Sequence, residues 1–398
     1  MSESDIGQNI TFFVYDSRHK QAVEPIAEEA SNRGYFVSFS DEVYEPAEIG
    51  VYTQHTGGIL PFNAKLSVAM FHGIDQGYMP DLWPKMENWR YVDIGFLPSE
   101  TAAETWRSCS HVPHARPKRG VFKVGWPKSD FVFKPGFEEQ VQQYKERYGI
   151  GDGTTVLYAP SYESGGKISE FVEKVDGAAD NLLVKHGPFD SGQYLEADTT
   201  LLDLYEKHSS KITPLDTDDN IFLGLGAADV LVSDESSVLL EASFTETVPV
   251  SVVDWPTATE SSPEDKELVP DLAVQTTSIN LSDEISEIIS SISSQKRKLV
   301  NARERHLENP GAGAQSVMDL IDDVRLNDQP DIDKLNPRKK NNLEYVYLLS
   351  LMQIERLESK IRWKIIENLS DSKKEFLRKH DIDDLYYRFS KLVGQYRS

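Results

Sequence analysis

Short apolar runs alternate with helical patterns along most of this chain, and they do so in two successive series. The first series opens with an apolar run at 10–16, a helical stretch at 20–34 that closes at Gly34, and a second run at 35–41. Such alternation is typical of βα units, in which helices join parallel strands. Further strands of this series are expected at 48–54, 65–73, 91–99 and 120–127, with a helix at 101–109.

The same pattern starts again after a helical stretch at 137–149. Strands of the second series are expected at 154–162, 181–187, 211–215, 228–234 and 248–254. The sequence therefore predicts an α/β protein with two Rossmann-like domains, the first at 1–150 and the second at 151–328. Because ligands of such sheets bind beyond the carboxyl ends of the strands, we expect the site in a cleft between the domains.

A linker and a basic helical tail are expected at 329–398. From residue 336 to the end there are 14 Lys plus Arg against 9 Asp plus Glu, a net charge of +5, whereas the whole chain carries −23. The stretches 343–369 and 373–396 are amphipathic. They fit a helical hairpin packed on the body, a contact in a homo-oligomer, or a helix pair on an anionic membrane surface.

Composition excludes several classes of protein. A net charge of −23 argues against a general nucleic-acid binder, which needs clustered Lys and Arg. The chain shows neither a signal-peptide pattern nor 18 consecutive apolar residues, so we expect a cytoplasmic protein, peripheral on the inner face of the cell membrane if the tail binds lipid. Cys109 is the only cysteine, which excludes an internal disulfide. His111 and His114 lack partner carboxylates, so no metal site is predicted.

The most informative segment joins the apolar run 228–234 to a helix expected from Val238. Ser236 and Ser237 lie at that junction, where backbone N–H groups and hydroxyls converge. A helix N-terminus attracts a phosphate or pyrophosphate. The alternative is that one of these serines simply caps the helix. The chain has no G-x-G-x-x-G segment, no Walker loop and no Gly-x-Ser-x-Gly elbow, which disfavours dehydrogenases, kinases and hydrolases.

This segment resembles the C-domain signature of the CDP-glycerol glycerophosphotransferases, the teichoic-acid-type enzymes. The matching positions are Asp219, Ala228 to Leu231, Ser233, Asp234, Ser236, Ser237 and Glu241. Glu235 stands where the family usually has Tyr.

Four further segments follow in the family's order. VLYAPSY at 156–162 contains Pro160 and Ser161, and GWPKSD at 125–130 contains Lys128, in place of the family's Arg, and Asp130. LLVKHGPF at 182–189 contains Lys185 and His186, with Gly187 inserted before Pro188. AMFHGIDQG at 69–77 contains His72 and Gly73 but lacks the usual continuation of that loop.

The resemblance implies a GT-B-like transferase with a C-terminal helical extension. Such an enzyme moves glycerol phosphate, or a related polyol phosphate, from a CDP-activated donor to a hydroxyl of a glycan or lipid-linked polymer and releases CMP. No cofactor is implied, and a divalent metal is not indicated.

The resemblance also suggests roles for single residues. His72 is expected to be the base that takes the acceptor proton, and His186 to donate to phosphate oxygens. The donor phosphates and nucleotide are expected to contact Ser233, Asp234, Ser236, Ser237, Glu241, Pro160 and Ser161, where Glu241 would reach the ribose hydroxyls. Supporting roles are expected for Gly73, Lys128, Asp130, Lys185 and Asp219.

Two alternatives stay open at this point. One is a nucleotide-sugar enzyme of the same architecture, either a GT-B glycosyltransferase or a UDP-sugar 2-epimerase, because a fold does not fix the chemistry. The other is a non-catalytic binding or assembly relative, which Glu235, Gly187 and the altered loop after His72 would fit.

Overall fold

The fold is described from a computed structural model. The structure describes residues 6–43, 45–53, 63–74, 88–187, 200–255, 272–307, 309–326 and 332–337. The tail stretches 343–369 and 373–396 lie outside these ranges, as do residues 75–77 of the loop after His72.

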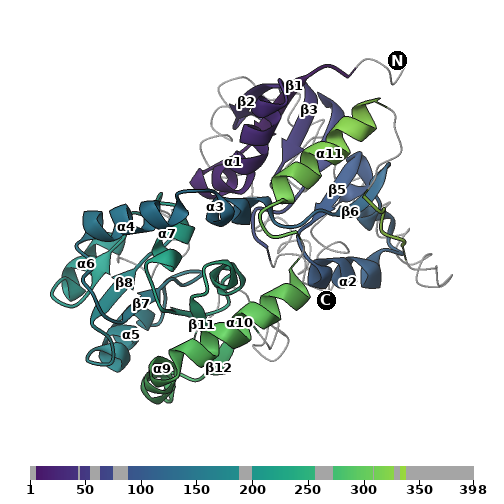
Figure 1. Ribbon diagram of the computed structural model, residues 1–398. Coiled ribbons are helices and arrows are strands. Elements are labelled where there is room, and N and C mark those ends of the chain that lie inside the picture. Colours follow the sequence, from purple (N-terminus) through teal and green to yellow (C-terminus); the bar gives the residue numbers. More distant parts are fainter. Residues whose placement is uncertain are drawn as a thin grey trace, which may run out of the picture.

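The first half of the chain forms a parallel six-stranded sheet with the order β2-β1-β3-β4-β5-β6 (Figure 1). Its strands are β1 Asn9–Phe13, β2 Phe36–Ser40, β3 Ala47–Tyr52, β4 Ala64–Ala69, β5 Ile94–Leu97 and β6 Gly120–Lys123. Helix α1, Ser17–Asn32, crosses over between β1 and β2, and α2, Glu100–Cys109, between β5 and β6. The inner strands form because their apolar side chains are fully buried, as Ile10 and Phe12 are.

The second half forms another parallel six-stranded sheet, with the order β12-β11-β10-β7-β8-β9. Its strands are β7 Thr155–Tyr158, β8 Asn181–Val184, β9 Thr213–Pro214, β10 Val230–Ser233, β11 Val248–Val252 and β12 Val274–Thr276. Its helices are α5 Lys167–Val175, α6 Leu201–His208, α7 Ile221–Gly226, α8 Val238–Glu241, α9 Leu281–Ser290 and α10 Ile292–His306. The predicted α/β fold with two Rossmann-like halves is confirmed.

Within the described residues, the polypeptide passes between the two halves twice. It leaves the first sheet through the 3-10 turn Pro127–Ser129, α3, Asp130–Phe133, and α4, Phe137–Tyr148. It returns after α10, and α11, Gly313–Leu326, packs against α1 of the first half (Figure 1). The segment that the sequence analysis placed at the end of the second domain thus lies on the first sheet.

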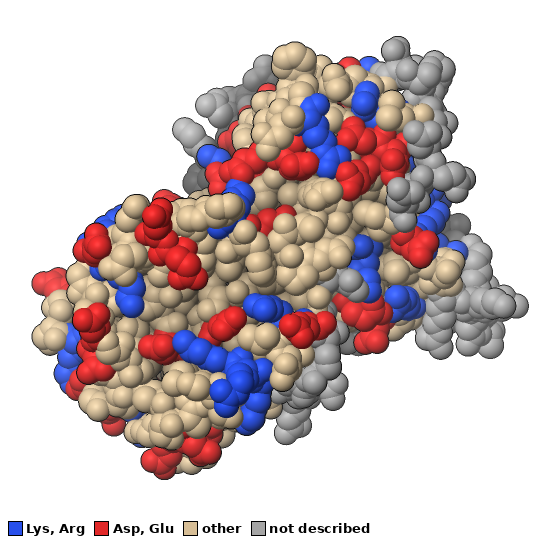
Figure 2. Space-filling view, in the orientation of Figure 1, with Lys and Arg blue, Asp and Glu red and all other residues tan. Residues whose placement is uncertain are grey.

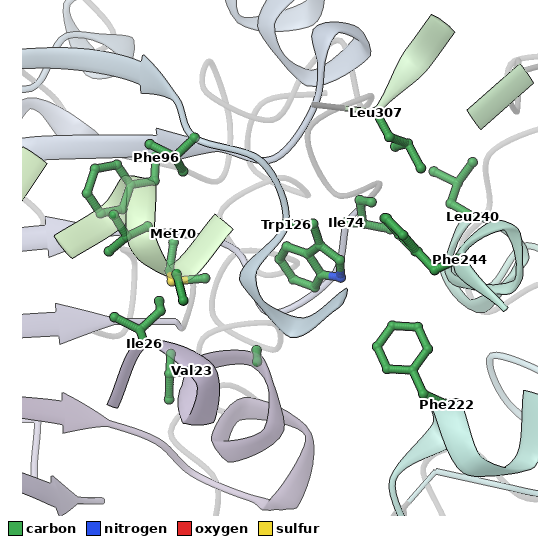
Figure 3. Close-up of a cluster of buried hydrophobic side chains, with 14 of the residues drawn as sticks. Val23, Ile26, Met70, Ile74, Phe96, Trp126, Phe222, Leu240, Phe244 and Leu307 are labelled. Atoms are coloured by element: carbon green, nitrogen blue, oxygen red, sulfur yellow. The ribbon is translucent and has the colours of Figure 1, made fainter. Parts of the chain in front are cut away.

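One hydrophobic core runs through the junction of the halves (Figure 3). Val23, Ile26 and Trp126 of the first half belong to the same buried cluster as Phe222 and Phe244 of the second. Side chains of this size each contribute roughly 1.5–3 kcal/mol when fully buried. The two halves are therefore held together by apolar packing as well as by polar contacts.

The charged side chains are unevenly placed on the face drawn in Figure 2. Acidic and basic groups lie in patches around a middle region that is largely tan, and blue Lys and Arg side chains gather over α10. That helix contains Lys296, Arg297 and Lys298 in succession. Within the described ranges, no helix has the length and apolar character needed to span a bilayer.

Candidate active site

The segments predicted to carry chemistry all follow the carboxyl ends of parallel strands. His72 lies beyond β4, Ser161 beyond β7, His186 beyond β8 and Ser236 beyond β10. The polarity of the two sheets thus brings each segment to the edge where open α/β sheets bind their ligands.

Asp234 ties the loops after β7 and β10 together. Its carboxylate accepts hydrogen bonds from the backbone N and the Oγ of Ser161, both at 2.8 Å, and from Lys167 Nζ at 2.7 Å. The Lys167 and Asp234 side chains are 0% and 1% exposed. Ser233 donates its hydroxyl to Ala159 O at 2.6 Å. Asp234 and Ser233 therefore fix the loops after β7 and β10, and Pro160 of the first loop is buried. The side chains of Asp234 and Ser233 make their hydrogen bonds to other groups of the protein.

Ser236 and Ser237 precede a helix much shorter than expected. Helix α8 spans only four residues and continues as the 3-10 turn Ala242–Phe244. Ser236 Oγ accepts a long hydrogen bond, 3.4 Å, from Val238 N, while Ser237 makes no side-chain cap. A single turn aligns few peptide dipoles, so the expected attraction of phosphate to this helix end is weak and any binding would depend on the hydroxyls.

His186 is enclosed in its own half of the molecule. Its Nδ1 lies 3.0 Å from Tyr205 Oη, and its Nε2 lies 3.0 Å from Glu163 Oε2. The histidine is 5% exposed. Glu163 Oε2 also accepts the Tyr158 hydroxyl at 2.7 Å. The expected hydrogen bond from His186 to a donor phosphate is not present in this arrangement, because both ring nitrogens already have partners.

The side-chain ammonium of Lys185, next to His186 in the sequence, lies at the junction of the halves. Its Nζ donates to Asp216 O at 2.7 Å and to Thr217 O at 2.9 Å. Burial lowers the pKa of Lys185 to about 8; the nearby Asp219 carboxylate opposes this shift and the Lys128 cation adds to it. An ammonium has three N–H donors, and these two carbonyls accept from two of them.

Lys128 and Glu241 link the two halves directly. Lys128 Nζ lies 3.0 and 3.1 Å from the two carboxylate oxygens of Glu241. The expected contact between Glu241 and a ribose is therefore replaced by an internal ion pair, because the two side chains meet across the junction and both are almost fully buried. Lys128, for which a supporting role was expected, is the cation of this ion pair.

Asp130 and Asp219 have structural partners that explain their positions. Asp130 accepts hydrogen bonds from the backbone N of Gly313 at 3.1 Å and of Ala314 at 2.7 Å, and so caps α11. Burial raises the pKa of Asp130 to about 6, against the effect of these hydrogen bonds. Asp219 accepts the Tyr148 hydroxyl at 2.6 Å and Arg147 Nη1 at 3.0 Å, which holds its loop on α4.

His72 belongs to the other wall of the junction. The histidine is half-buried and is followed by the buried Gly73. Its Nδ1 lies 3.4 Å from Thr53 O, and its ring centroid lies 4.3 Å from that of His19. Because a carbonyl oxygen only accepts, a neutral His72 that makes this contact carries its proton on Nδ1 and its lone pair on Nε2.

The beginning of α1 connects the two walls. Ser17 Oγ donates to Asp218 Oδ1 at 2.8 Å, and Gln21 Nε2 donates to Asp218 O at 3.0 Å. Asp218 follows the two carbonyls that hold Lys185. The structure thus places the His72 wall and the Lys185 loop at one junction, while His186 lies behind Lys185 inside the second half.

Sequence reasoning did not identify several residues that shape this site. They are Lys167, Glu163, Tyr205, Asp16 and His19. The first two lie in SYESGGK at 161–167, where two glycines before a lysine indicate a loop after a buried strand. Nothing in the sequence pairs Tyr205 with His186 or His19 with His72, because these contacts join segments distant in the chain.

No metal centre is found in the part of the chain that the structure describes, where no group of three or more His, Cys, Asp and Glu is arranged to hold an ion. His114 is buried, which lowers its pKa, and Cys109 is a buried thiol whose pKa burial raises to about 12. These residues lie around α2 and take no part in the junction.

Comparison with known proteins identifies the family. The family model described as CDP-Glycerol:Poly(glycerophosphate) glycerophosphotransferase matches residues 73–321. No curated protein sequence matches this chain.

Solved structures share the fold. A variant of the wall teichoic acid polymerase TagF has a TM-score of 0.58 at 15% identity, over 82% of this chain and 90% of that chain. A TagF variant soaked with CDPG has a TM-score of 0.57 at 14% identity, over 80% of this chain and 89% of that chain. The S. aureus MnaA-UDP co-structure has a TM-score of 0.50 at 12% identity, over 82% and 99%.

The family match favours glycerophosphate transfer over the nucleotide-sugar and non-catalytic alternatives, and the structural matches establish the shared two-domain fold. Because the matched segment covers more than half of the chain, this protein belongs to the CDP-glycerol:poly(glycerophosphate) glycerophosphotransferase family and is a transferase of that type.

Proposed function

We propose that this protein transfers glycerol phosphate from CDP-glycerol to a terminal hydroxyl of a glycan or lipid-linked polymer, at the junction between its two halves. The observation that carries the proposal is the position of His72, whose Nδ1 faces Thr53 O at 3.4 Å beside the α1 turn that contacts the second half. The family match supplies the donor class.

His72 acts as the general base in this proposal. The contact with Thr53 selects the tautomer that has its lone pair on Nε2, and an imidazole accepts a proton at modest cost near neutral pH. The acceptor hydroxyl oxygen attacks the phosphorus that bears glycerol, and its proton passes to Nε2. A new O–P bond forms while the O–P bond to CMP breaks, and CMP leaves with that electron pair.

Lys185 supplies the positive charge for the departing CMP. Two of its N–H groups are held by the carbonyls of Asp216 and Thr217, which fixes the orientation of the ammonium, and the third N–H is assigned to a phosphate oxygen of the donor. A preorganised cation in a partly dry site stabilises charge that develops in the transition state. The hydroxyls of Ser236 and Ser237 would contact the donor from the neighbouring loop.

We expect the reaction to need no divalent metal, because this proposal assigns the charge on the donor to Lys185. An excess of EDTA should leave CMP release unchanged. Loss of activity that Mg²⁺ restores would contradict this part of the proposal.

The protein is proposed to work in the cytoplasm at the inner face of the membrane. The net charge of +5 from residue 336 onward would attract it to anionic lipid. Full-length protein should sediment with vesicles that contain phosphatidylglycerol and release at high salt, and it should ignore phosphatidylcholine vesicles. If the protein sediments with neither kind of vesicle, membrane binding by the tail is contradicted. Light scattering would then test whether the tail makes a contact between copies of the protein.

The donor assignment is tested by incubating the purified protein with CDP-glycerol and a polymer acceptor and measuring CMP. The wild type should release CMP, and His72→Ala should release it roughly 100- to 10,000-fold more slowly, the range in which a general base contributes. Turnover of a UDP-sugar with no use of CDP-glycerol would overturn the proposal.

A further inference from the structure

His19 lies against His72 and is itself held in place by Asp16. Asp16 is the N-cap of α1, and its carboxylate accepts the backbone N–H groups of Arg18 and His19 at 2.9 and 3.1 Å. The same Oδ1 lies 2.9 Å from His19 Nδ1. One carboxylate oxygen therefore fixes both the start of the helix and the orientation of the His19 ring.

Neighbouring hydrogen-bond donors stabilise the negative charge of Asp16. Burial raises the pKa of Asp16, but hydrogen bonds from His19 and Arg18 outweigh that effect and hold the pKa well below its usual range. Arg18 Nη2 lies 2.6 Å from the second carboxylate oxygen. Asp16 is thus an anion with several donors, which makes it a firm anchor for the imidazole of His19.

The His19 ring forms one side of the space that His72 occupies. The two ring centroids are 4.3 Å apart and the ring planes are inclined by 51°. Tyr15 lies edge-on to His19, with a centroid distance of 5.9 Å. His19 is only 7% exposed, so it has little freedom to move away from His72.

We propose that His19, anchored by Asp16, is a positioning residue that holds the His72 imidazole in its reactive orientation. The His72 ring contacts Thr53 O through Nδ1 at 3.4 Å and packs against the fixed His19 ring at a centroid distance of 4.3 Å. Packing against a fixed aromatic ring limits rotation of the His72 imidazole. This inference rests on the proposed role of His72 as base.

The same turn of α1 connects this arrangement to the second half. Ser17 and Gln21, on either side of His19 in the sequence, bond the side chain and backbone of Asp218. The orientation of His72 is thereby set relative to the loop that holds Lys185. A base and a cation that act on one phosphoryl group need that shared frame, since small misplacements are costly.

Three substitutions separate the contributions. His19→Ala removes both the ring and its bond to Asp16, and His19→Phe keeps a ring beside His72 but loses the bond. Asp16→Asn keeps an oxygen that caps the helix but removes the anionic anchor. Ser31→Ala, at the far end of α1, is the matched control for general disturbance of the helix.

We expect His19→Ala to lower kcat for CMP release roughly 10- to 100-fold with KM for CDP-glycerol unchanged. His19→Phe and Asp16→Asn should fall between His19→Ala and the wild type, and Ser31→Ala should match the wild type. A fall in kcat that follows only the loss of thermal stability across the series would overturn the proposal.

A spectroscopic readout distinguishes failure of this inference from failure of the proposed function. The ¹⁵N chemical shifts of the His72 ring report its tautomer with or without turnover. They should indicate a proton on Nδ1 in the wild type and a mixture of tautomers in His19→Ala. Unchanged His72 shifts in His19→Ala would overturn the inference, even if the wild type uses CDP-glycerol as proposed. If the wild type releases no CMP, the ¹⁵N shifts still decide whether His19 orients His72.

Discussion

Lys128 and Glu241 form an ion pair that joins the two halves of the molecule, with Lys128 Nζ at 3.0 Å from Glu241 Oε1. Their side chains are only 8% and 4% exposed, so neither charge is compensated by water. Lys128 belongs to the segment that leaves the first sheet, and Glu241 ends α8 of the second. The pair therefore fixes the distance between the connecting segment and the loop that contains Ser236 and Ser237.

Breaking this pair from one side should be costly. Glu241→Gln leaves the Lys128 cation buried without its partner, and removing one member of such a pair costs about 3–5 kcal/mol. The free energy of unfolding, measured with urea, should fall by that amount. In the double variant Lys128→Met with Glu241→Met, most of the loss should be recovered, because no unpaired charge remains. A double variant with a free energy of unfolding as low as that of Glu241→Gln, or lower, would contradict this account.

The cation on Lys185 should give the enzyme an alkaline limit. With its pKa lowered to about 8 by burial, Lys185 is charged below that pH and loses its charge above it, where its ability to hold an anionic donor declines. The kcat/KM for CDP-glycerol, which reports the free enzyme, should therefore fall above about pH 8. In Lys185→Arg the charge persists, so the fall should disappear. A fall at the same pH in Lys185→Arg would assign it to another group.

The short apolar runs predicted every strand of the two sheets except β12, because strands buried on both faces are continuous in hydrophobicity, as Val230 to Val232 are. Which loops lie together also followed from the sequence, since parallel strands present all their carboxyl ends at one edge. What each loop residue contacts did not follow. His186 was expected to face a ligand, and it bonds Tyr205 and Glu163.

Helix ends were harder to predict than strands, because tertiary contacts decided them. Helices α9 and α10 are separated at Ser291, with no Gly or Pro to mark the break. Helix α8 ends early in a turn where Glu246 has a φ of 59°, a conformation that favours glycine. That Asp130 caps a helix 183 residues further along the chain has no local signal.

The cap that Asp130 gives to α11 should contribute measurably to stability. Its two oxygens accept from Gly313 N and Ala314 N, and the loss of an N-cap side chain costs about 0.5–2 kcal/mol. Asp130→Ala should therefore lower the free energy of unfolding by about that amount, and Asp130→Asn, which keeps one accepting oxygen, by less. Equal stability of all three proteins in urea would show that the cap contributes nothing.

Glu163 should be the residue on which the His186 network depends. Its Oε2 accepts both the Tyr158 hydroxyl at 2.7 Å and His186 Nε2 at 3.0 Å, and its Oε1 accepts Ile168 N at 3.0 Å. In Glu163→Gln the amide NH₂ cannot accept, so at least one buried donor is left without a partner, at a cost of about 1–3 kcal/mol. Tyr205→Phe should cost less, because it removes a single hydrogen bond at the other ring nitrogen.

Urea unfolding of the two single variants and the double variant should give a coupling energy of about 0.5–3 kcal/mol, since both Glu163 and Tyr205 hold the His186 imidazole. Strictly additive losses would mean that Glu163 and Tyr205 act independently, and His186 would then not be the link between them.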